Sequence, residues 1–241
     1  MNAVLTLSLL LIVLLCTWAG YKRGLILSVF CILAIIVSIY GANLLSTTYS
    51  YEVIDALRPF ASGYVETTIN DKVRSEYDIA GVETASISVD DYLAAHPDEI
   101  QPFCRSTFEH LGIHEKTAGR LAAETEEYAA KQEMDIRDAL VEVLCLRITY
   151  VAGFILAFIL LLIILTVLGN LPNLSFKIPD MDVLNDIGGL VLGIIQGLLF
   201  CFIITWALRF TGIILPQETL GESAILSWFM RQDLLYRFLG I

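Results

Sequence analysis

The chain begins MNAVLTLSLLLIVLLCTWAGY (residues 1–21), a stretch without a charged side chain that decides the fold. After Lys22 and Arg23, a second uncharged stretch runs over 24–51, and two more occupy 148–176 and 187–208. A helix needs about 20 apolar residues to cross the hydrocarbon core, so each stretch accommodates one span. The stretches lack the alternation of barrel strands, and backbone groups in lipid need internal partners. We therefore expect four transmembrane helices, near 2–20, 25–46, 148–169 and 188–209.

The composition agrees with a membrane protein. Of the 241 residues, 56% are hydrophobic and 17% are charged, whereas soluble domains are about 25% charged. The formal net charge of −11 argues against a nucleic-acid partner, because phosphate binding needs clustered Lys and Arg. With five cysteines and six prolines, the chain is neither a disulfide scaffold nor a collagen.

The negative charge lies in one region. Residues 51–147 contain 20 Asp and Glu but only 9 Lys and Arg, an excess that accounts for the whole net charge. The sequence thus predicts an all-α polytopic membrane protein with four transmembrane helices in two hairpins and a helical extramembrane insert. We expect a first hairpin at 1–48, an acidic insert at 49–147, a second hairpin at 148–211 and an amphipathic interfacial tail at 212–241.

Lys22 and Arg23 give the topology signal. Two basic residues in so short a loop favour the cytoplasmic side. The N-terminus, insert and tail are then extracytoplasmic, and the 170–187 loop is cytoplasmic. The basic residues near span ends on the opposite side, against this assignment, are Arg58, Arg137, Arg147 and Arg209. Because no basic residue precedes the first span and no small-x-small site follows it, we expect that span to be retained rather than cleaved as a signal peptide.

The insert has the pattern of amphipathic helices. Its apolar stripes comprise Val65, Ile69, Val73 and Tyr77; Ile100, Phe103, Cys104, Phe108 and Leu111; and Ile136, Leu140 and Leu144. A helix start is expected near Ser88, a stop at Gly112, and one continuous helix from about Thr117 into the third span. Residues 223–239 suggest a further helix, which either lies at the membrane interface or packs on the insert.

Glycines suggest a close helix contact. Gly189, Gly193 and Gly197 share one face of the fourth span, beside Gly188, and Gly153 and Ala157 form a shorter pair in the third. Small residues at four-residue spacing let helix backbones approach closely. We predict a tight interface on this face, either within the hairpin or between protomers.

Chemistry is hard to find in this sequence. Cys104, His110 and His114 are too few and too poorly spaced for a zinc site, so we predict no metal or cofactor. Because familiar catalytic motifs are lacking, we predict no catalytic residues and no enzyme. The candidate polar intramembrane residues are Gln196, Thr205 and Arg209 at the span edge. We expect all five cysteines to be reduced, although Cys104 and Cys145 could pair outside the cell.

Three motifs carry a family resemblance: the turn GYKRGL (20–25), the segment LNDIGGLVLGIIQGLL (184–199) and ESAIL (222–226). Over roughly 1–48 and 146–230 the chain resembles the colicin V production protein (CvpA) family of bacterial inner-membrane proteins. It departs from the pattern at Asp186, where a basic residue is usual, and in its longer insert. The resemblance implies a multi-pass inner-membrane protein of toxin production or export, or of envelope homeostasis.

The functional hypothesis is a non-enzymatic membrane scaffold or accessory factor in those processes. Its expected partners are the lipid bilayer, a second copy in a homo-oligomer and an extracytoplasmic protein bound through 49–147. The alternative is a small oligomeric channel or transporter lined by polar residues of the spans. A weaker third hypothesis is cation sensing by the acidic insert.

Overall fold

The computed structural model describes residues 2–73, 89–170, 182–210, 224–232 and 235. The regular elements in these residues are all helical, with no strand among them. In chain order they are α1 (Asn2–Thr68), the π-helical η1 (Ile69–Val73), α3 (Val89–Ala95), the 3₁₀ helix η3 (Pro97–Glu99), α4 (Ile100–His110), α5 (Glu115–Gln132), α6 (Ile136–Asn170), α7 (Asp182–Leu208) and α9 (Ala224–Arg231). The all-α prediction is thereby confirmed for this part of the chain.

Three of these helices, α1, α6 and α7, are long and apolar enough to cross a membrane, judged by length and composition. They contain the described residues of the four uncharged stretches. The chain therefore has the helices of a membrane protein, as its composition indicated.

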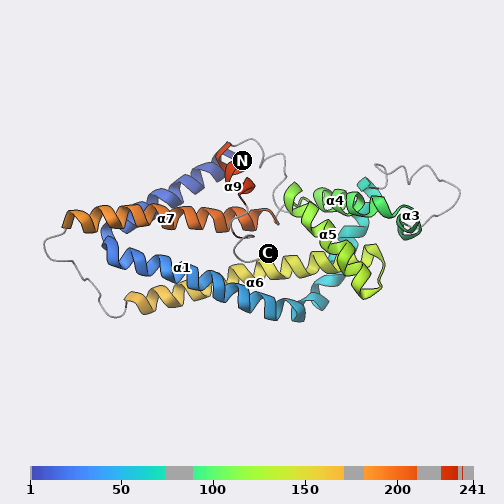
Figure 1. Cartoon of the computed structure of the whole chain (residues 1–241), viewed down its shortest axis with the longest axis horizontal. Helices are drawn as coiled ribbons and strands as arrows, with labels where there is room; N and C mark the ends of the chain where they lie inside the picture. The colour runs from blue at the N-terminus through green and yellow to red at the C-terminus, as the bar shows by residue number, and fades with distance from the viewer. Residues whose placement is uncertain (1, 74–88, 171–181, 211–223, 233–234, 236–241) are drawn as a thin grey trace. The chain divides into compact units, whose positions relative to one another are not determined.

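α1 consists of two helices joined by a kink. Gly24 has non-helical angles, φ 80° and ψ 178°, so the helical hydrogen-bond ladder is interrupted there. In Figure 1 the two parts of α1 run in different directions from this point. We call residues 2–23 the first segment of α1 and residues 25–68 the second segment.

The chain divides into two compact units. The membrane unit comprises Met1–Thr47, Ala152–Leu208 and Glu218–Ile241, and the insert unit comprises Thr48–Val151 and Arg209–Gln217. Arg209, which the sequence prediction assigned to the second hairpin, thus falls in the insert unit.

Within the membrane unit, each segment of α1 packs on another apolar helix. The first segment contacts α7, where Val13 lies by Gly197 and Gly20 lies by Gly189, so the two helices run antiparallel. The second segment contacts α6, where Ser46 lies by Gly153. The second segment and α6 run side by side in Figure 1.

The tail helix α9 packs on the membrane unit. Leu226, Phe229 and Met230 are buried in a cluster with Leu9 of α1 and Cys201 of α7. Its other face, with Ile225 and Trp228, is exposed. This amphipathic arrangement suits a helix at a membrane surface. Residues 212–223 and most of 233–241 of the predicted tail lie outside the described residues.

The insert unit has its own apolar core. The stripes predicted from the sequence supply much of it, with Phe103, Cys104 and Phe108 of α4 fully buried. Residues of α5 and α6, among them Leu121, Leu140 and Leu144, complete the core, together with Val65 and Ile69. Tyr77, from one of the predicted stripes, and Ser88, the predicted helix start, lie outside the described residues. α4 ends before Gly112, which has φ +89°, as predicted.

One prediction about the insert was wrong. The expected continuous helix from about Thr117 into the third span is interrupted, because α5 ends at Gln132 and α6 begins at Ile136. Glu133 adopts the left-handed conformation with φ 52° and ψ 44°, and its N–H donates to the Ala129 carbonyl. A non-glycine residue can end a helix in this way, although Gly would be the usual signal.

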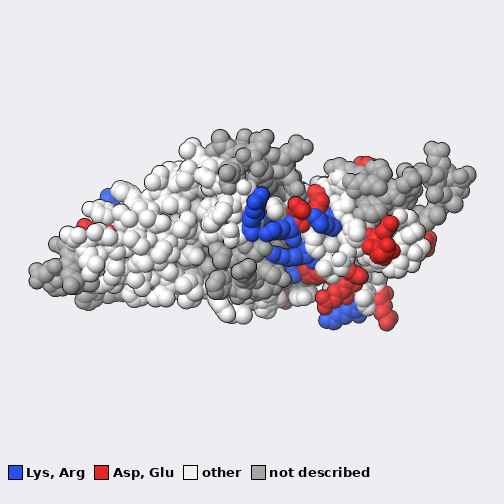
Figure 2. All heavy atoms as spheres, turned by 45° about the horizontal axis from the view of Figure 1, so that its top comes forward, with Lys and Arg blue, Asp and Glu red and all other residues white. Residues whose placement is uncertain are grey.

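Charged side chains cover the insert unit. In the view of Figure 2 they gather over its helices, while the long apolar helices are mostly white. Several arginines here are paired with carboxylates: Arg147 binds Glu124 through two nitrogens at 2.7–3.0 Å, and Arg137 Nε lies 2.8 Å from Asp90. Such a surface is suited to water.

Candidate functional site

The glycine face of α7 contacts the first segment of α1 backbone to backbone. A Cβ placed on Gly193 would lie 2.5 Å from the Cys16 carbonyl oxygen and 2.9 Å from Thr17 Cα. A Cβ on Gly197 would lie 2.8 Å from Val13 Cα. Since real Cβ atoms do not approach backbone so closely, any larger residue would force the helices apart.

Glycine also lies on the opposite side of this contact, near the turn. A Cβ on Gly20 would meet the backbone of Gly189 and lie 2.8 Å from Gly193 Cα. Gly188 differs from its neighbours, because the atoms nearest to it belong to the Leu25 side chain. The predicted tight interface thus lies inside the chain, between the first and last apolar stretches, rather than within the second hairpin.

Asn185, at the start of α7, holds the kink of α1. Its Oδ1 accepts a 2.9 Å hydrogen bond from the Leu25 N–H, and the residue is only 8% exposed. Leu25 opens a new helix after Gly24, where N–H groups have no intrahelical acceptor. Glycine is needed at position 24 for two reasons: its φ is +80°, and a Cβ there would lie 2.7 Å from Asn185 Oδ1. On the other side of the kink, Ser28 donates to the Gly20 carbonyl at 3.4 Å.

The two basic residues of the turn are exposed. Lys22 Nζ lies 4.1 Å from the centre of the Trp18 ring, in cation–π geometry. Arg23 Nη1 donates to Cys31 Sγ at 3.3 Å, across the kink. Both cations therefore lie at the end of the membrane unit where the first segment turns back.

The small residues of α6 make a looser contact than those of α7. A Cβ on Gly153 would lie 3.2 Å from Ser46 Oγ, which a small side-chain movement could relieve. Ala157 is half-buried. The pair therefore permits close packing on the second segment without backbone contact.

The candidate polar residues of the spans have different surroundings. Thr205 is buried, and its hydroxyl donates to the Cys201 carbonyl at 2.8 Å, within its own helix. Gln196 is half-buried on α7. Arg209 is 3% exposed in the insert unit, and its carbonyl accepts a 3.2 Å bond from the His114 N–H. The Thr205 hydroxyl is therefore engaged by its own helix.

Cys104 of the insert has the character of a core residue. Burial, and to a lesser degree the charge of Glu126, raises the pKa of its thiol to about 12. All five cysteines are free, including Cys145. Among the residues that the structure describes, no group of three or more His, Cys, Asp or Glu is placed to hold a metal ion.

Sequence reasoning missed Asn185 and Ser28 as positioning residues. Asn185 appears in the 184–199 motif, but nothing in the motif assigns it a partner 160 positions earlier in the chain. A signal was available: a buried amide at the first turn of an apolar span needs hydrogen-bond partners, and a glycine kink supplies unpaired backbone groups.

The fold and this contact define a class: helical membrane proteins whose apolar helices pack closely through glycine and which carry a second helical unit with charged side chains on its surface. The family described as Colicin V production protein matches residues 118–233, so the chain carries a domain of this family over that range. The family prediction is confirmed there; the match begins in α5 and does not include the first hairpin. No curated protein and no solved structure matches the chain.

Proposed function

We propose that the protein is a non-enzymatic scaffold of the bacterial inner membrane, with four spans and an extracytoplasmic insert that binds a protein partner. The two segments of α1 supply the first two spans, and α6 and α7 supply the others. The first segment, residues 2–23, would extend about 33 Å at 1.5 Å per residue, which matches the hydrocarbon thickness.

The observation that carries the proposal is the backbone contact between α7 and the first segment of α1. Where Gly193 touches Cys16 and Thr17, the helices leave no room for water or ions between them. Close packing of this kind favours a rigid support over a conduction path along this contact. The family name, Colicin V production protein, is consistent with an accessory role in making or exporting a toxin.

The insert is the part of the scaffold suited to a partner. Its described residues form an apolar core and carry charged side chains on the surface, so the insert can present side chains to a partner without exposing that core. On α5, Ala123, Glu127 and Ala130 are exposed. A photo-reactive amino acid at Ala123 or Ala130 in living cells is expected to crosslink one discrete protein.

The lipid-facing Leu7, which is 68% exposed, is the matched control position and should give no such protein adduct. Absence of any adduct from the insert, together with ion or solute flux in liposomes that Gln196→Leu abolishes, would overturn the scaffold in favour of a channel. No flux with a discrete adduct supports the scaffold.

The turn supports the proposed topology. Because Lys22 and Arg23 are exposed at the same end of the membrane unit, the positive-inside rule places this end in the cytoplasm. Single cysteines at Lys22 and at Glu127, in a variant without the five native cysteines, test this. A membrane-impermeant maleimide should label the Glu127→Cys variant in intact cells and the Lys22→Cys variant only after lysis; the reverse pattern would invert the topology.

Self-association of the scaffold needs a surface other than the glycine face, since that face is occupied within the chain. The exposed apolar residues of α6, such as Leu156 and Ile163, remain available to a second copy. Light scattering with size exclusion should give a mass above the monomer that Gly193→Ala does not specifically reduce.

A further inference from the structure

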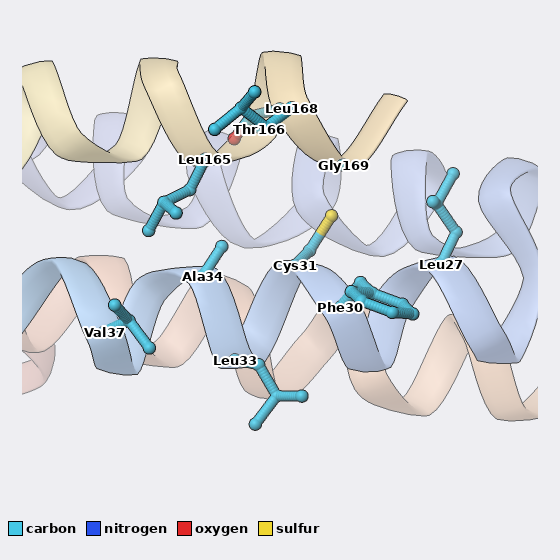
Figure 3. Close-up of a pocket in the computed structure, with 10 residues that line it drawn as sticks. All are labelled: Leu27, Phe30, Cys31, Leu33, Ala34, Val37, Leu165, Thr166, Leu168 and Gly169. Carbon is cyan, nitrogen blue, oxygen red and sulfur yellow. The ribbon is translucent and has the colours of Figure 1, made fainter. Parts of the chain in front are cut away.

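An apolar groove of about 360 Å³ runs along the membrane unit between the second segment of α1 and the end of α6. Its walls include Leu27, Phe30, Ala34 and Val37 from α1 and Leu165 and Leu168 from α6 (Figure 3). Val37 is ten positions after Leu27, so the groove is about 15 Å long at the helical rise. Its walls face outward: Phe30, Val37 and Leu168 are 48–54% exposed, as expected of a surface open to lipid chains.

A cation contacts one wall of this groove. Cys31 lines the groove, and its sulfur points toward Gly169 of α6 in Figure 3. The Arg23 guanidinium donates to that sulfur at 3.3 Å. Cys31 therefore contacts both the apolar groove and the positive charge of Arg23.

The bonding of Arg23 differs from that of the insert arginines. Arg58, Arg105, Arg137 and Arg147 each bind a carboxylate at 3.1 Å or less. Among the described residues, Arg23 donates to a thiol, a weak acceptor, and no carboxylate there lies at ion-pair distance from it. Its planar fork of five N–H donors is suited to a phosphate.

We propose that the groove binds an anionic phospholipid, with one acyl chain along the apolar walls and the phosphate on Arg23. A neighbouring helix could cover the apolar walls but would leave the guanidinium without an anion. A phospholipid satisfies both at once. This site is independent of the scaffold proposal, since it requires only that the chain resides in a bilayer.

The test uses the purified full chain in detergent, titrated with phosphatidylglycerol or phosphatidylcholine and followed by native mass spectrometry. The expected result is preferential binding of phosphatidylglycerol, which Arg23→Gln weakens by about tenfold, the equivalent of one charge-assisted hydrogen bond. Ala34→Phe, which fills the groove, should weaken both lipids. Arg105→Gln, in the insert, is the matched control and should change nothing.

Three results would overturn the proposal. The first is equal binding of the two lipids to the wild-type chain. The second is unchanged phosphatidylglycerol binding in Arg23→Gln, a variant whose exposed side chain should leave folding intact. The third is an Ala34→Phe chain whose mass falls to that of the monomer while it binds lipid normally, which would assign the groove to a second copy. If Ala34→Phe fails to fold, the smaller substitution Ala34→Leu replaces it.

Free glycerol phosphate should not compete with phosphatidylglycerol for the groove, because it lacks the acyl chain.

Discussion

The glycine contact predicts that Gly193→Ala destabilises the membrane unit. The added methyl would lie 2.5 Å from the Cys16 oxygen and 2.9 Å from Thr17 Cα. Ordinary contacts of carbon are about 3.5–4.0 Å, so the helices must separate by about 1 Å at this level. Neither atom belongs to a side chain, and so rotation of a side chain cannot relieve the overlap.

The magnitude follows from two opposing effects. Overpacking costs about 1–3 kcal/mol, whereas replacing glycine by alanine inside a helix gains up to about 1 kcal/mol. We expect a net loss of about 1–2 kcal/mol in the free energy of unfolding, and a larger loss for Gly193→Leu. The assay is unfolding by sodium dodecyl sulfate in mixed micelles, followed by far-UV circular dichroism.

The matched control is Gly169→Ala on α6. Among the described residues, a Cβ on Gly169 meets nothing within 4 Å, so this variant should be neutral or slightly stabilised. Equal stability of the Gly193→Ala and Gly169→Ala chains would refute the conclusion that α7 and α1 touch through their backbones.

Three further predictions concern single residues. Asn185→Leu removes the acceptor of the Leu25 N–H at the kink and should cost about 1–3 kcal/mol in the same unfolding assay; no loss would mean that the bond is dispensable. Phe103→Ala leaves a cavity at a fully buried position and should lower the free energy of unfolding of the insert by about 3–5 kcal/mol, which a drop in its melting temperature would report. The exposed Phe60→Ala is its control and should change the stability by under about 0.5 kcal/mol. At pH 8, Cys104 should resist iodoacetamide until the chain is denatured, since a raised pKa of about 12 leaves it protonated; rapid labelling of the native protein, detected by mass spectrometry of peptides, would contradict its burial.

The sequence predicted the elements better than their partners. Uncharged stretches are a strong signal, because a charge in the hydrocarbon core is costly, and all four stretches are helical where described. The turn at Gly24 was also foreseeable from two basic residues between glycines. Local sequence could not predict that the second segment of α1 continues past Pro59 to Thr68, or that Glu133 ends α5 without a glycine.

The partner of the glycine face was harder to predict, for a physical reason. Three glycines on α7 specify that a backbone approaches, but glycine has no side chain with which to select among backbones. The selection comes from Gly20 on the other helix and from Asn185, whose amide requires the unpaired N–H of Leu25. Each of these signals is a single residue. Its role can be recognised only when the first segment of α1 is known to lie beside α7.

The two units are stabilised by different physics, and this makes their roles separable by experiment. In lipid, apolar burial gives little drive for helix association, so the membrane unit depends on closeness of approach, as at Gly193. In water the stability of the insert depends on buried residues such as Phe103, and salt weakens its exposed ion pairs by screening them. Gly193→Ala should therefore destabilise the membrane unit and leave the core of the insert unit intact. Phe103→Ala should destabilise the insert unit and leave the membrane unit intact. If crosslinking from Ala123 survives Gly193→Ala but fails in Phe103→Ala, recognition belongs to the insert itself; the reverse result would mean that the membrane helices make the binding surface.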